Sequence, residues 1–83
     1  MVYEVLVGKK VLKNIEKMPI PLQKKLVNLI DDLCEKGPLR IEWPHFSKLG
    51  EDRYHCHLAH KWVACWQWKK QSIIIESILC GQS

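Results

Sequence analysis

The chain has 83 residues, of which 47% are hydrophobic and 27% are charged. This length fits one domain, residues 1–83, and excludes a two-domain enzyme, a TIM barrel or a dinucleotide-binding domain joined to a substrate domain. Thirteen Lys and Arg against nine Asp and Glu give a formal net charge of +4, which favours an anionic partner, either a nucleic acid or an acidic protein.

The sequence predicts neither a membrane segment nor export. The longest uninterrupted apolar stretch is residues 62–66, far short of the ~20 residues that a membrane helix needs, and residues 1–4 do not resemble a signal peptide. Four cysteines in a short chain are enough for two disulfides, but all except the last lie within apolar or aromatic patterns: Cys34, Cys56, Cys65 and Cys80. We therefore expect reduced, mostly buried thiols in a cytoplasmic protein.

The first half of the chain predicts one strand and two helices. Residues 2–7 are rich in β-branched side chains and end at a glycine, which is typical of a short strand. Residues 9–18 form a Lys-rich helix that ends at Pro19. The next helix spans residues 21–36, because its apolar residues recur with offsets of 4, 7, 8 and 11: Leu22, Leu26, Leu29, Ile30 and Leu33. Gly37 and Pro38 end it.

The second half predicts a long loop and three strands. Residues 38–52 show no regular period, and a loop of that length in a small domain is usually functional or ordered by a partner. Strands follow at residues 54–58, 62–68 and 73–79, with short connections typical of antiparallel neighbours. The order β-α-α-β-β-β predicts an α+β fold in which a helical hairpin packs on a small, mainly antiparallel sheet.

His55 and His57 are the candidate acid–base residues. Residues two apart in a strand share a face, so both imidazoles project from the same side. Such a pair suits RNA cleavage, which needs a base for the 2′-hydroxyl and an acid for the leaving oxygen. The alternative is that both are surface histidines on a solvated strand face. Trp62, Trp66 and Trp68 share strand parity and are expected in the core, whereas Trp43, in the loop, is the candidate for contact with RNA or a partner protein.

Three segments resemble a known family. Residues 46–50 (FSKLG), 54–58 (YHCHL) and 61–63 (KWV) follow a short strand and a Lys-rich helical hairpin. This order and its K-L…Y-x-x-x-L string resemble the RelE/ParE superfamily of toxins from type II toxin–antitoxin systems, over nearly the whole chain. In that superfamily, RelE-like members are ribosome-dependent endoribonucleases (mRNA interferases) that cut mRNA in the A site. ParE-like members share the fold and inhibit DNA gyrase.

The resemblance implies roles for individual residues. RelE-like toxins carry site-lining lysines at the strand positions of His55 and His57, and a phosphate-contacting Arg at the position of Lys61. Lys61 supplies a positive charge, but unlike Arg it cannot make two parallel hydrogen bonds to one phosphate group. Lys48 and Arg53 lie where the family adds basic contacts, so both are expected to bind RNA; the alternative for each is ordinary surface solubility.

The last residues depart from the family pattern. RelE-like toxins follow the last strand with Gly, an Arg and then a Tyr or His, whereas this chain reads Cys80-Gly81-Gln82-Ser83. Two interpretations stay open. Either the site is built differently and His55 and His57 contribute more of the catalysis, or this protein is impaired in its activity.

No metal site or small-molecule cofactor is predicted. Cys56 and His57 are ligand types, but strand alternation sends them to opposite faces and no C-x-x-C pair accompanies them.

Two functions therefore remain. The first is a cytoplasmic RelE-like toxin that cleaves ribosome-bound mRNA and is masked by a cognate antitoxin protein. The second is a non-nucleolytic protein of the same fold, either directed at gyrase or inactive but still able to bind an antitoxin.

Overall fold

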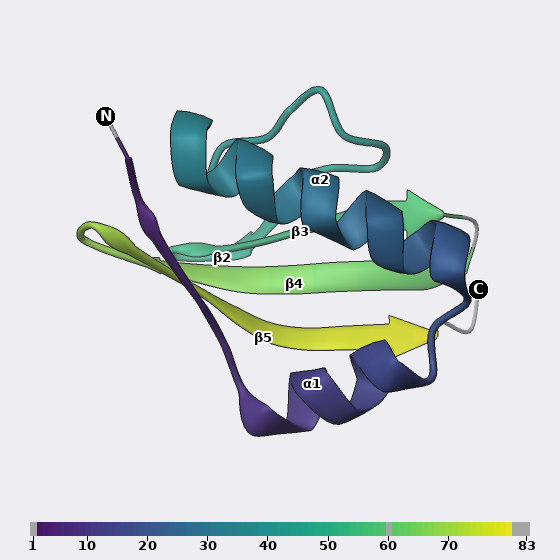
Figure 1. Cartoon of the computed structure of the whole chain (residues 1–83). Helices are drawn as coiled ribbons and strands as arrows, with labels where there is room; N and C mark the ends of the chain where they lie inside the picture. The colour runs from purple at the N-terminus through teal and green to yellow at the C-terminus, as the bar shows by residue number, and fades with distance from the viewer. Residues whose placement is uncertain (1, 60, 81–83) are drawn as a thin grey trace.

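The chain forms a five-stranded sheet with two helices packed against it (Figure 1). The computed structural model describes residues 2–59 and 61–80, with only the backbone at residue 80. In chain order the elements are β1 (Glu4–Val7), α1 (Lys9–Glu16), α2 (Ile20–Lys36), β2 (Ser47–Gly50), β3 (Arg53–Ala59), β4 (Trp62–Lys69) and β5 (Ser72–Cys80). Among the described residues, no helix is long and apolar enough to span a membrane.

The strand order is β1-β5-β4-β3-β2, with β1 parallel to β5 and the other neighbours antiparallel. The predicted α+β class and mainly antiparallel sheet are confirmed. Residues 81–83, on which the predicted departure from the family pattern depends, lie outside the described part.

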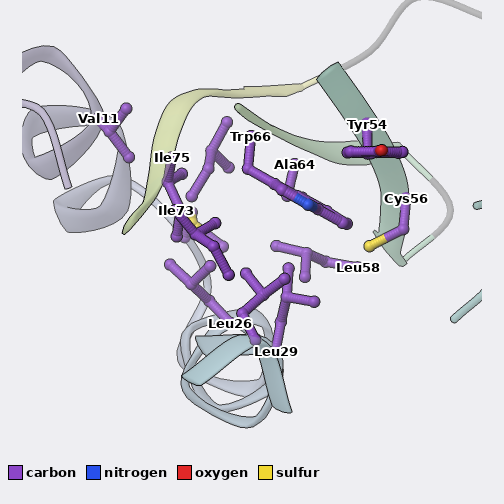
Figure 2. Close-up of a cluster of buried hydrophobic side chains, with 13 residues drawn as sticks. Val11, Leu26, Leu29, Tyr54, Cys56, Leu58, Ala64, Trp66, Ile73 and Ile75 are labelled. Atoms are coloured by element: carbon purple, nitrogen blue, oxygen red, sulfur yellow. The ribbon is translucent and has the colours of Figure 1, made fainter. Parts of the chain in front are cut away.

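The core lies between α2 and the sheet. Leu26, Leu29 and Leu33 of α2 are buried, as their helical spacing predicts, because residues three and four apart share a helix face. Figure 2 shows Leu26 and Leu29 below the Trp66 indole of β4. Trp66 is fully buried, and its indole Nε1–H donates to the carbonyl oxygen of Pro38 at 3.1 Å. The largest core side chain thus has its one polar atom satisfied. Trp62 and Trp68 pack against the same cluster, as predicted.

Gly37 ends α2 in a conformation that suits glycine. Its φ is +97°, a region in which side chains are strained, and a Cβ placed there would lie 3.0 Å from Cε1 of Tyr3. The Tyr3 N–H donates to the carbonyl oxygen of Cys34 at 2.7 Å, which ties the chain before β1 to the last turn of the helix. The predicted end of the helix at Gly37 and Pro38 is therefore confirmed. The same glycine also lets Tyr3 pack closely against the end of the helix.

The segment between α2 and β3 differs from the prediction of a structureless loop. Ser47–Gly50 forms the edge strand β2, which pairs with β3. The preceding residues are tied to the protein itself: the Trp43 indole Nε1–H donates to Oδ2 of Asp32 at 2.9 Å, and the Phe46 ring stacks on Tyr54 at 5.7 Å. In Figure 1 this segment arches over α2 before it reaches β2. Its order comes from contacts within the chain.

Candidate functional site

The histidines of β3 lie on the sheet face that points away from the helices. Burial alternates along β3: Tyr54, Cys56 and Leu58 are buried in the core, and His55 and His57 between them are half-buried. Their ring centroids are 6.1 Å apart. The predicted side-by-side placement of the two imidazoles is therefore confirmed, while their catalytic role stays a prediction.

The edge strand β2 brings a hydroxyl to His55. Ser47 is the register partner of His55, and its Oγ lies 2.8 Å from Nε2 of the ring. The other ring nitrogen, Nδ1, is buried and has no hydrogen-bond partner among the described residues. Nε2, together with the Ser47 hydroxyl, is therefore the end of the ring at which His55 can exchange a proton.

A third histidine, which the sequence reasoning missed, completes this group. The His45 ring packs on His57 with centroids 4.6 Å apart and planes tilted by 45°. The two segments are also joined through their backbones, because the His57 N–H donates to the carbonyl oxygen of Pro44 at 2.8 Å. We call His45, His55 and His57, with the Ser47 hydroxyl, the histidine cluster. Phe46, which lies between the two added residues, packs against the core.

The predicted basic residues are not all part of this cluster. Lys48 pairs with Tyr54, so strand alternation directs it to the opposite face from Ser47. Arg53 lies at the start of β3, and its Nε is 3.5 Å from Oε1 of Glu76 on β5, which partly neutralises it. Lys61 is exposed in the turn before β4, not on the strand itself. The roles of these three residues in RNA binding or catalysis stay predictions.

Trp43 is less available than predicted. It is half-buried, packs against the core and donates its indole N–H to Asp32. It forms one wall of an open groove of about 500 Å³ between α2 and the chain before β2, together with Lys25, Leu58 and Pro44. An indole face in this groove can still contact a partner, but its position is fixed by α2.

The three thiols that the structure describes are unpaired. Cys34, Cys56 and Cys65 are free, and Cys34 and Cys65 are only half-buried, against the expectation of mostly buried thiols. Burial raises the pKa of the Cys56 thiol from 9.0 to about 12, with smaller contributions from Cys65 and Glu42. Within residues 2–59 and 61–80, no group of three His, Cys, Asp or Glu side chains is arranged to hold a metal ion. Imidazoles such as those of the histidine cluster can take part in proton transfer.

The sequence itself matches no protein-family model and no curated protein. Solved structures are similar in three dimensions. The isolated RelE toxin of E. coli has a TM-score of 0.78 at 15% identity, covering 98% of this chain and 86% of that one. The YoeB dimer of Staphylococcus aureus has 0.77 at 15% identity, covering 100% and 99%.

RelE in the archaeal RelE–RelB complex from Pyrococcus horikoshii OT3 has a TM-score of 0.75 at 20% identity, covering 94% and 93%. The similarity spans the whole sheet and both helices, so it is a likeness of complete domains. The chain therefore has the fold of the RelE and YoeB toxins of type II toxin–antitoxin systems.

Proposed function

We propose that this protein is the toxin of a type II toxin–antitoxin system and acts in the cytoplasm as a ribosome-dependent endoribonuclease. The observation that carries the proposal is the histidine cluster on the outer sheet face of a RelE-like fold. Two imidazoles with centroids 6.1 Å apart are close enough to act on the same phosphate group. The net charge of +4 favours an RNA substrate over a neutral one.

Each step of the cleavage has a residue to perform it. The 2′-hydroxyl oxygen attacks the phosphorus while one imidazole takes its proton. The P–O5′ bond then breaks, and the second imidazole, already protonated, gives its proton to the departing 5′-oxygen. The products are a 2′,3′-cyclic phosphate and a 5′-hydroxyl. In this scheme His55 and His57 are the acid–base pair, and Lys61 offsets the charge that develops on the phosphate oxygens.

The first experiment measures cleavage of mRNA bound to programmed ribosomes. Removing one positioned proton donor or acceptor costs ~10²–10⁴-fold in rate, so His55→Ala and His57→Ala should each lose activity in that range. Gln67→Ala, on the same sheet face one strand away, is the matched control and should cleave like the wild type. The cyclic phosphate at the new 3′ end identifies the reaction. The pH profile is a further readout, because an imidazole pair is expected to give a cleavage rate that peaks near neutral pH and a lysine-lined site is not.

The proposed partner is an acidic antitoxin. The structures of similar fold include RelE with RelB from Pyrococcus horikoshii and YoeB with YefM from Staphylococcus aureus. On this chain, Leu12 of α1 and Ile20 and Val27 of α2 are exposed apolar residues beside exposed lysines. Such a surface suits an amphipathic, negatively charged segment. Co-expression with the product of the neighbouring gene should give a complex that weakens as salt is added. If no such product co-purifies, the antitoxin proposal is contradicted.

The alternative is a non-nucleolytic protein of the same fold. It is favoured by the state of His55, because Nε2 is engaged by Ser47 and Nδ1 is closed off from solvent. A histidine held in this way also fits a purely structural role. If the wild type binds its antitoxin tightly but cleaves no mRNA, this alternative replaces the nuclease, and inhibition of gyrase becomes the next assay.

A further inference from the structure

His45 occupies a backbone conformation that is uncommon for residues other than glycine. Its φ is +54°, in the left-handed region, which among the other residue types Asn, Asp and His enter most often. Strained residues of this kind persist only when the surrounding structure holds them, and they gather at functional sites. The position is exposed and no core packing requires an imidazole there. A glycine would fit the backbone more easily, so the ring itself needs an explanation.

The segment around His45 is fixed on both sides. Before it, the Trp43 indole is hydrogen-bonded to Asp32 of α2, and the Pro44 carbonyl accepts the His57 N–H at 2.8 Å. After it, the Phe46 ring stacks on Tyr54 at 5.7 Å. These anchors hold the His45 backbone in place without help from its side chain. The imidazole is therefore carried to a defined position, against the face of His57 at 4.6 Å.

The contact limits how the His57 ring can turn. Proton transfer needs an imidazole nitrogen within hydrogen-bond reach of the substrate oxygen, so the orientation of the half-buried His57 ring matters for cleavage. The His57 ring has two imidazole neighbours, with centroid distances of 4.6 Å to His45 and 6.1 Å to His55. Of the two, His45 makes the closer ring contact and therefore restricts the His57 ring more.

We propose that His45 is a positioning residue of the RNA-cleavage site, which holds the His57 imidazole in the orientation that proton transfer requires. This inference rests on the proposed nuclease function, in which His57 contacts the substrate. It assigns His45 no proton transfer of its own.

The test uses two substitutions whose effects on stability and on activity are opposite. His45→Gly removes the ring and suits a φ of +54°, so the melting temperature should stay the same or rise while kcat falls about 10- to 100-fold with KM unchanged. His45→Phe restores a ring against His57 but is strained in the left-handed region, so it should be less stable than His45→Gly and yet cleave faster. Ile41→Ala, at an exposed site in the same segment, is the control and should match the wild type in both measurements.

A second measurement does not depend on cleavage. The ring protons of His57 feel the ring current of His45 at 4.6 Å, so their NMR shifts should change in His45→Gly and return toward the wild-type values in His45→Phe. Unchanged His57 shifts in His45→Gly would overturn the positioning contact itself.

The two proposals fail in different ways. If the wild type cleaves mRNA and His45→Gly cleaves equally fast, the inference about His45 is wrong while the nuclease stands. Equal loss of activity in His45→Gly and His45→Phe would also overturn it, since a positioning ring must be replaceable by another ring. A wild type that does not cleave at all contradicts the nuclease, and the role of His45 in cleavage with it.

Discussion

Arg40 should be the residue on which the order of the segment before the histidine cluster most depends. Its side chain is 11% exposed, and its guanidinium makes three hydrogen bonds. Nε donates to the carbonyl oxygen of Gly37 at 3.0 Å, and a terminal nitrogen donates to that of Lys36 at 3.2 Å. The other terminal nitrogen lies 2.8 Å from Oε2 of Glu42. Arg40 therefore caps the end of α2 and ties it to the chain that leads to His45.

The expected cost of Arg40→Met follows from these contacts. Hydrogen bonds from a charged donor contribute about 1.5–3 kcal/mol when buried, but the Glu42 carboxylate is half exposed, and such ion pairs contribute about 0–1 kcal/mol. Because water can reach part of the vacated space, we expect a total loss of about 3 kcal/mol. A domain of this size has a free energy of unfolding of about 4–12 kcal/mol, so the variant should remain folded but melt about 12–24 °C lower.

The assay is urea unfolding followed by tryptophan fluorescence, to which the four tryptophans contribute, among them Trp66 in the core. Arg53→Met is the matched control, because Arg53 is also paired with a carboxylate, at 3.5 Å, but its side chain is 58% exposed. It should lose less than about 1 kcal/mol. If the two variants lose equal stability, the buried hydrogen bonds of Arg40 are not what orders this segment. Arg40→Met should also lower mRNA cleavage by the folded protein, since it loosens the backbone that carries His45.

Four further outcomes are expected. Gly37→Ala should destabilise the protein by about 2 kcal/mol in thermal unfolding, because φ is +97° and the new Cβ would lie 3.0 Å from a tyrosine ring. At pH 8, iodoacetamide should modify the half-buried Cys65 before the buried Cys56, as mass spectrometry would show. Because the pKa of Cys56 is raised to about 12, the folded protein keeps that thiol protonated while the unfolded chain ionises it. Stability should therefore be constant up to about pH 9 and fall as the pH approaches 12. Glu76→Gln should strengthen RNA binding and steepen its salt dependence, since it releases the charge of Arg53; unchanged binding would remove Arg53 from the RNA surface.

Local patterns in the sequence were sufficient to predict the helices and the main strands. The leucine spacing of α2 places Leu26, Leu29 and Leu33 on one buried stripe, and Gly37 ends the helix because it accepts a positive φ. Alternation along β3 likewise predicts that His55 and His57 share a face. In each case the deciding interaction joins residues of one element, so the spacing within that element carries the information.

Strand β2 could not be found in this way. All four of its residues, Ser47–Gly50, are exposed, so the strand has no hydrophobic alternation. It exists because β3 offers a free edge for pairing, and that edge depends on the completed sheet. The same holds for the exposed basic residues, whose neighbours are set by strand register: nothing in the spacing of Arg53 and Glu76 indicates that they meet across β4.

The missed strand accounts for Ser47, which pairs with His55 in the ladder between β2 and β3. His45 precedes β2, in a turn with a φ of +54°, so its contact with His57 comes from the turn and not from strand pairing. Phe46, between His45 and Ser47, packs against the core. A correct register for β2 would therefore have predicted the Ser47–His55 hydrogen bond, but not the His45–His57 ring contact, which depends on the turn before the strand. Because the site is formed by the pairing of two strands and by the turn before one of them, the spacing of residues on one strand could reveal only half of it.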